Sequence, residues 1–173
     1  MKFTKRTFLI WWGAGLAIFA FSIFLHSPLT ITGVPGGILD HQAAGSAARV
    51  NEIQQLWAEA GLLGRARLAM QSDLIFIGIY GIGAVLAGAY FRTRPSRLLR
   101  PAGLVLIVSG IAFLVSDYLE TILQFIQLDR LSGDNTLSAI AAACGPIKVA
   151  AFLASFALVL IALAFERFSS RAA

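Results

Sequence analysis

Two carboxylates lie one helical turn apart near the end of an apolar segment that is long enough to cross a membrane. They are Asp117 and Glu120, in the stretch SDYLETILQ at residues 116–124. A crowded and partly desolvated carboxyl group can hold or release a proton near neutral pH, which is what a general acid or base requires. Asp117 and Glu120 are therefore the candidate catalytic residues.

The same helix face continues with two amides. Asp117, Glu120, Gln124 and Gln127 follow the spacing i, i+3, i+7 and i+10, which places them on one side of a helix. Polar groups inside a membrane are costly unless they pair. We therefore expect this polar stripe to face the interior of a helix bundle.

Ionisable residues of other apolar segments are predicted to lie at the same depth. Counting 1.5 Å per residue from the basic ends of the segments, Asp117 lies about 24 Å and Lys148 about 25 Å away. By the same count Asp73 lies at about 27 Å, while Glu120 and His26 lie at about 28 Å. This agreement predicts one charged layer. We expect Lys148 to contact Asp117 and expect Glu120, without a basic partner, to face Asp73 or His26.

The predicted ligand-binding residues of this layer are Asp73, Tyr80, Asp117, Glu120, Gln124 and Lys148. Tyr80 shares a helix face with Asp73 but lies about 10 Å deeper. An alternative interpretation is purely structural. In that case Lys148 neutralises one carboxylate, and an arginine of the outer connection, Arg65 or Arg67, pairs with Asp73.

The composition indicates which elements position these residues. The chain has 173 residues, of which 58% are hydrophobic and 13% charged, against about 25% charged residues in soluble domains. A membrane-spanning helix needs about 20 apolar residues. We predict an all-α fold: a single integral membrane domain, residues 1–173, with a bundle of four transmembrane helices at about residues 7–26, 72–91, 101–127 and 138–165. The first segment is interpreted as a retained helix rather than a cleaved signal peptide.

The basic residues predict the orientation. They cluster at the ends of apolar segments, which suits membrane orientation better than nucleic-acid binding. Three basic segments fall on one side of a four-span chain, namely Lys2, Lys5 and Arg6; Arg92, Arg94, Arg97 and Arg100; and Arg167 and Arg171. Both termini are therefore expected in the cytoplasm.

The first outer connection, residues 27–71, is predicted to contain an additional amphipathic helix at about residues 46–64. Ser46 is its candidate N-cap. Its apolar face would be formed by Val50, Ile53, Trp57 and Ala60. We expect Trp57 to be buried against the outer surface of the bundle.

Small residues predict where helices approach each other within the membrane. The second apolar segment carries Gly78, Gly81, Ala84 and Gly88, and the fourth carries Ala150, Ala154 and Ala157. We expect these two faces to be close-packed against each other.

These motifs resemble an uncharacterised group of small bacterial four-helix integral membrane proteins. The resemblance rests on Ala44-Gly45 to Trp57, on DLIFIGIY from Asp73 to Tyr80, on DYLE from Asp117 to Glu120, and on IKVAAF around Lys148. It covers most of residues 40–155, and it departs from the group at Thr121, where the group often has asparagine. The resemblance implies the architecture, the site and a location in the bacterial inner (cytoplasmic) membrane, but it implies no activity.

Two functions stay open from the sequence. The first is a non-enzymatic membrane protein whose outward-facing charged layer binds a small ligand or lipid, or which serves as an accessory subunit. The second is a small membrane enzyme that uses Asp117 or Glu120 as acid or base on a lipid-like substrate. The expected partners are membrane lipid, a lipid-like ligand, and a membrane protein or a second copy of the chain. We expect no nucleic acid, no cofactor and no metal, since no paired-histidine or Cys-x-x-Cys spacing occurs.

Overall fold

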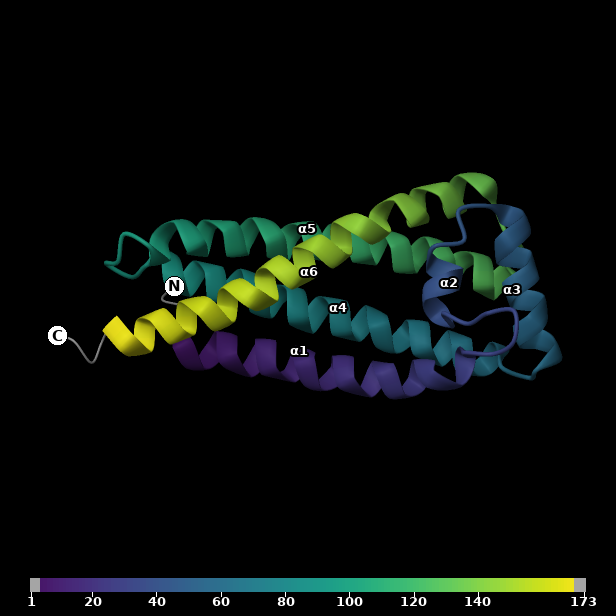
Figure 1. Ribbon diagram of the computed structural model, residues 1–173, viewed down its shortest axis with the longest axis horizontal. Helices are drawn as coiled ribbons and strands as arrows, with labels where there is room; N and C mark the ends of the chain where they lie inside the picture. Colours follow the sequence, from purple (N-terminus) through teal and green to yellow (C-terminus); the bar gives the residue numbers. More distant parts are fainter. Residues whose placement is uncertain (1–3, 170–173) are drawn as a thin grey trace.

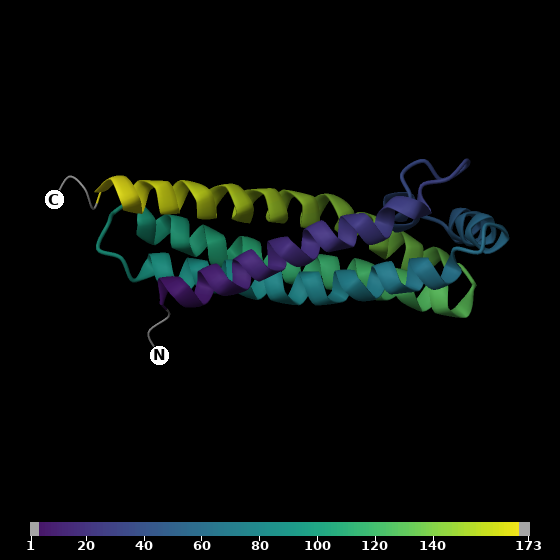
Figure 2. The ribbon, with the colours of Figure 1, turned by 90° about the horizontal axis from the view of Figure 1, so that it is seen from below.

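The computed structural model describes residues 4–169 and consists of helices joined by short connections (Figures 1 and 2). Four helices are long and apolar enough to cross a membrane: α1 (Lys5–His26), α4 (Leu63–Arg92), α5 (Leu99–Arg130) and α6 (Asn135–Ser169). Lys2 and Arg171, on which the orientation prediction partly rests, lie outside the described residues.

Most of the long helices extend beyond the predicted segments. The largest difference is at α4, which begins at Leu63 instead of near residue 72. Residues 63–71 are rich in Ala, Leu, Arg and Met, which favour helix strongly. The prediction ended where the apolar run ended, whereas the helix itself continues past that run.

The four long helices form an elongated bundle in which α1 packs on α4, α4 on α5, and α5 on α6. α6 crosses the bundle obliquely (Figure 1), and the backbones of α1 and α6 come close at few places, so these helices meet mainly through long side chains such as Trp12 and Phe156. The first turn of α1, the last turn of α6 and the 93–98 connection lie at one end of the bundle, which we call the terminal end. There the Lys5 ammonium lies 2.8 Å from Glu166 Oε2 and ties α1 to α6.

The glycine face of α4 packs against α5 and not against α6, so the predicted contact with the fourth segment is wrong. A Cβ atom on Gly88 would lie 2.6 Å from the backbone oxygen of Gly103. α5 carries glycines seven residues apart, Gly103 and Gly110, as α4 does at Gly81 and Gly88. Matching small residues on both helices let two backbones approach more closely than a small residue on one side alone.

We expect Gly88→Ala to lower the free energy of unfolding by about 1–3 kcal/mol, because the added methyl group would force two backbones apart. Gly13→Ala is the matched control, since a Cβ atom at Gly13 meets nothing within 4 Å. That control should be neutral or stabilise by up to about 1 kcal/mol through helix propensity. Denaturation in mixed micelles measures both variants, and equal effects would contradict the close contact.

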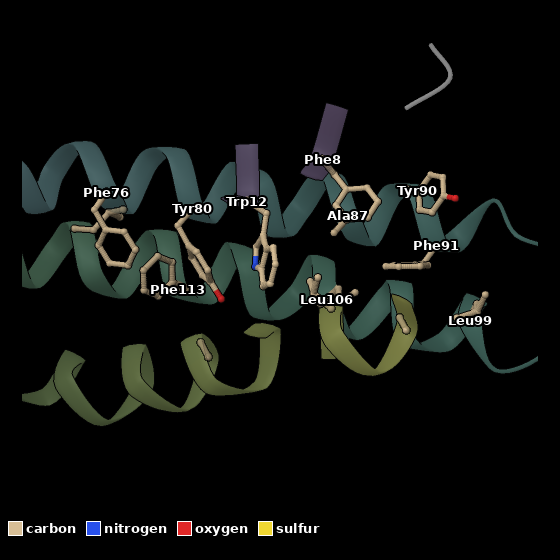
Figure 3. Close-up of a cluster of buried hydrophobic side chains, with 14 residues drawn as sticks. Phe8, Trp12, Phe76, Tyr80, Ala87, Tyr90, Phe91, Leu99, Leu106 and Phe113 are labelled. Carbon is tan, nitrogen blue, oxygen red and sulfur yellow. The ribbon is translucent and has the colours of Figure 1, made fainter. Parts of the chain in front are cut away.

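Aromatic side chains fill the bundle between the four long helices (Figure 3). The ring centroid of Tyr80 lies 5.2 Å from that of Phe113 and 4.8 Å from that of Phe152. Trp12 stacks on Phe156 at 5.7 Å. Figure 3 shows the labelled members of this core as a row along the bundle axis. The core thus holds the long helices together on the terminal side of the charged layer.

Residues 27–62 connect α1 to α4 across the opposite end of the bundle, and we call this segment the cap (Figure 1). It contains η1 (Ser27–Leu29), α2 (Ile38–Gln42) and α3 (Ala47–Glu59). Ser46 accepts a hydrogen bond from the Arg49 amide at 3.3 Å and caps α3, as expected. α3 ends at Glu59 and not near residue 64, because Gly61 adopts a φ of +69°, a conformation that stops helices.

Trp57 anchors the cap to the bundle. Its side chain is fully buried, and its Nε1 donates a hydrogen bond to the Leu29 carbonyl at 3.0 Å. Val50 and Ile53 are buried beside it, whereas Ala60 is exposed. The predicted burial of Trp57 is confirmed. The inclusion of Ala60 in the buried face is wrong, since α3 has already ended there.

His41 of α2 stacks on Trp57, with ring centroids 5.3 Å apart. Burial lowers the pKa of His41 to about 4 from its ordinary value of 6.5, because the charged imidazolium would lose its hydration. Its Nδ1 has no hydrogen-bond partner among the described residues. The cap is therefore built around a neutral imidazole.

We expect docking of the cap to weaken as the pH falls from about 6.5 to about 4. Above this window both docked and undocked states hold a neutral His41, but within it only the undocked state takes up the proton. The lost stability amounts to roughly 3 kcal/mol at the lower end. Trp57 fluorescence in a Trp11→Phe/Trp12→Phe background measures the transition. His41→Phe keeps the stacking and should remove this part of the pH dependence; an unchanged profile would contradict the assignment.

Candidate functional site

Lys148 of α6 is the centre of the charged layer beneath the cap. Its Nζ lies 3.3 Å from Asp117 Oδ1 and 3.1 Å from Gln42 Oε1, and it also contacts Glu120 Oε2. The predicted contact with Asp117 is confirmed, but the prediction that Glu120 has no basic partner is wrong. Asp117 and Glu120 occupy one helix face one turn apart, so an ammonium on a four-carbon stem reaches both.

Asp73 of α4 pairs with His26 at the end of α1, where Asp73 Oδ1 and His26 Nε2 lie 3.1 Å apart. The alternative partners, Arg65 and Arg67, do not reach it. Arg65 is exposed, and Arg67 lies 3.6 Å from Asp129. Because α4 already begins at Leu63, Arg67 stands about 9 Å along the same helix from Asp73 and points away from the layer.

The two amides of the polar stripe fasten the cap and the turn between α5 and α6. Both are buried. Gln124 donates to the backbone oxygen of Gln42 at 3.4 Å. Gln127 Oε1 accepts from the Asp134 amide at 2.8 Å and from the Ser138 hydroxyl at 2.9 Å. Both amides are bonded to the protein itself. Gln124, a predicted ligand-binding residue, therefore has a structural role, and it does not line the cavity that is described below.

Tyr80 also lies away from that cavity. Its ring is fully buried in the aromatic core, and its hydroxyl group lies 3.0 Å from the Ser155 hydroxyl and 3.3 Å from the Phe152 carbonyl oxygen. The shared face with Asp73 was expected correctly. The greater depth of Tyr80, however, puts its hydroxyl group against α6 within the core.

An apolar cavity of about 460 Å³ lies between α1 and α6 and ends at the charged layer. Phe19 and Ile23 line it from α1, Val149 and Leu153 from α6, and Phe76 and Phe113 from the two central helices, α4 and α5. Ile23, Val149 and Leu153 are each more than half exposed. The cavity therefore opens sideways between α1 and α6, and α2 covers its end with Ile38 and Leu39.

Seven polar residues line the closed end of the cavity, beneath the cap: His26, Ser27, Thr30, Gln42, Asp73, Asp117 and Lys148. Glu120 contacts the cavity only through Lys148. Gln42 was missed by the sequence analysis, and a single glutamine in a five-residue helix carries no pattern that could have identified it. Its role follows from the docking of the cap, which brings α2 over Lys148.

The arrangement suits the binding of an amphiphile, with an apolar slot at the surface and a charged end below the cap. Within residues 4–169, no group of three or more His, Cys, Asp or Glu side chains could hold a metal ion. Comparisons with protein-family models, curated proteins and solved structures find no match to this chain.

Proposed function

We propose that this chain is a multi-pass protein of the bacterial inner membrane that binds a lipid-like amphiphile in the cavity between α1 and α6. The observation that carries the proposal is the position of the opening. It lies on the flank of the bundle, where a membrane would surround the four long helices, and its exposed rim is apolar. Its volume of about 460 Å³ is within the range of small-molecule sites, roughly 300–1,000 Å³.

The proposal includes the orientation and the resemblance to small bacterial four-helix membrane proteins. The terminal end carries a clear excess of basic residues, including Arg6, Arg92, Arg97 and Arg100. Such an excess favours the cytoplasmic side. The cap and the closed end of the cavity would then lie at the outer leaflet, and the amphiphile would enter from that leaflet.

Cysteine labelling in intact cells tests the orientation. In a Cys144→Ala background, a membrane-impermeant thiol reagent should label Glu59→Cys in the cap and should not label Ser96→Cys at the terminal end. Both cysteines should react once the membrane is permeabilised. Labelling of Ser96→Cys in intact cells would refute the orientation.

Native mass spectrometry of protein released from lipid nanodiscs tests the binding function. We expect the wild type to retain an amphiphile and expect Val149→Trp to reduce the retained fraction about tenfold, equivalent to 1.4 kcal/mol, because the indole would fill the slot. Ile161→Trp is the matched control, since Ile161 is exposed on α6 but does not line the cavity. Equal retention by the two variants, or no retention by the wild type, would contradict the proposal.

The second candidate function is an enzyme acting on the same amphiphile. The cavity reaches Asp117 but not Glu120, which favours Asp117 as the acid or base. Asp117→Asn distinguishes the two functions. An enzyme would accumulate unreacted substrate in this variant and so retain a species of different mass from that in the wild type. A binding protein would retain the same species in both.

A further inference from the structure

The Lys148 ammonium is surrounded by acceptors of the protein itself. An ammonium group has three N–H donors and no acceptor. Lys148 Nζ donates hydrogen bonds to Gln42 Oε1 at 3.1 Å and Asp117 Oδ1 at 3.3 Å, and it forms an ion pair with Glu120 Oε2. A phosphate or carboxylate head group would therefore have to compete with these three protein acceptors for the Lys148 ammonium.

Two carboxylate oxygens at the same place have no donor. His26 lies against Asp73 Oδ1, and Lys148 and Thr121 contact Asp117 Oδ1. No donor among the described residues contacts the Oδ2 atom of either carboxylate. Both residues line the cavity, although Asp73 is only 7% exposed and Asp117 only 6%. A carboxylate oxygen without a protein donor at such a cavity is free to accept a hydrogen bond from a ligand.

The net charge of the side chains at the closed end is negative, which also favours a cationic head group. Around the closed end stand the carboxylates of Asp73, Asp117 and Glu120, opposed by the Lys148 ammonium and the His26 imidazole. With the carboxylates ionised, the set stays negative whether or not His26 is protonated. The Gln42 amide and the Ser27 and Thr30 hydroxyl groups also line the cavity, but they are neutral and cannot offset this charge. In a site shielded from water, an anionic head group would be repelled more strongly than in solution.

The apolar part of the cavity accommodates a chain rather than a bulky ring system. From Phe19 to His26 it follows seven residues of α1, about 10 Å along the helix. Its walls are the exposed aliphatic side chains of Ile23, Val149 and Leu153, with Phe76 and Phe113 at the inner side. A single alkyl chain can lie in such a slot and leave its distal part among the membrane lipids.

From these observations we infer that the ligand is a single-chain amphiphile with a protonated amine as its head group, donating to Asp73 Oδ2 and Asp117 Oδ2. The inference rests on the proposed binding function and gives its ligand a chemical class. A primary ammonium matches both the unused acceptors and the negative charge. A phosphate head meets neither requirement, and an uncharged alcohol meets only the first.

Three probes with the same twelve-carbon chain test the inference: dodecylamine, dodecanol and dodecyl phosphate. Each is titrated at pH 7 into the protein in nanodiscs, and retention is measured by native mass spectrometry against Val149→Trp, which corrects for partitioning into lipid. We expect dodecylamine to bind the wild type at least tenfold more tightly than either other probe. Asp73→Asn should weaken the binding of dodecylamine about tenfold and should change the binding of dodecanol by no more than about twofold. Asp129→Asn, an exposed acid at the same end of the bundle, should change neither probe.

The outcomes separate the inference from the function on which it rests. Equal or tighter binding of dodecanol or dodecyl phosphate would overturn the amine assignment and leave the amphiphile site in place. The amine assignment would also be overturned if dodecylamine bound Asp73→Asn and the wild type equally well. If no probe bound the wild type better than Val149→Trp, the proposed function itself would fail. Asp73→Asn is preferred to Asp117→Asn because Asp73 is not part of the Lys148 network.

Discussion

Lys148→Met is expected to lower the free energy of unfolding by about 3–5 kcal/mol, the usual cost of removing one partner from a buried ion pair. The loss falls at the upper end of this range because Lys148 contacts two carboxylates, Asp117 and Glu120, and also holds Gln42 of the cap. Methionine keeps most of the side-chain volume, so the change reports on charge and hydrogen bonding. Denaturation in mixed micelles measures it.

The geometry predicts how the loss is recovered. Lys148→Met with Asp117→Leu should restore only part of the stability, because Glu120 would still be buried without its ammonium partner. Adding Glu120→Leu should restore most of the remainder, since apolar replacement of a whole buried network is often neutral or stabilising. Lys5→Met is the control, because the exposed Lys5–Glu166 pair should contribute about 0–1 kcal/mol. Full recovery in the double variant would show that the Glu120 contact is unimportant.

Trp57→Ala should destabilise the cap by about 4 kcal/mol. Removing a fully buried aromatic side chain costs about 3–5 kcal/mol, and Leu29 loses its hydrogen bond from Nε1. His41 would also lose its stacking partner. Faster proteolysis within residues 27–62 and a lower midpoint of thermal unfolding are the measurements.

Two further variants distinguish the contributions at Trp57. Trp57→Phe keeps most of the ring and removes the donor, so it should cost only about 1 kcal/mol. Trp11→Ala is the matched control on α1, where the indole is 38% exposed, and its effect should be small. A loss at Trp57 no larger than the loss at Trp11 would mean that the cap is only loosely attached.

Several features of this protein follow from local sequence. Long apolar runs identify all four long helices, because the requirement for about 20 apolar residues concerns each segment by itself. Ser46 marks the start of α3, since N-capping involves only neighbouring residues. The contact between Asp117 and Lys148 could be predicted as well. Distance along a helix is a simple count of residues, and two opposite charges at one depth inside a bundle must pair.

Other features depend on how the helices are arranged around one another. The same count placed His26 and Asp73 in the layer, but it could not say that Asp73 would face α1 or that Lys148 would reach Glu120 as well as Asp117. The glycine face of α4 was visible in the sequence, whereas its partner was not, because small residues specify close approach without specifying the neighbour. Rotation about the helix axis and the order of helices are set by the packing of the whole bundle.

The cavity is the feature that only the tertiary structure decided. It exists because α1 and α6 pack mainly on α4 and α5, and their own backbones come close at few places, so a space remains between them near the cap. Gln42 enters the site because the buried Trp57 and Leu29 hold the cap over Lys148. The charged residues of the site could be predicted from their types and from their depth along the helices. Their exposure to a ligand depends on a gap between two helices more than a hundred residues apart, and no local pattern encodes such a gap.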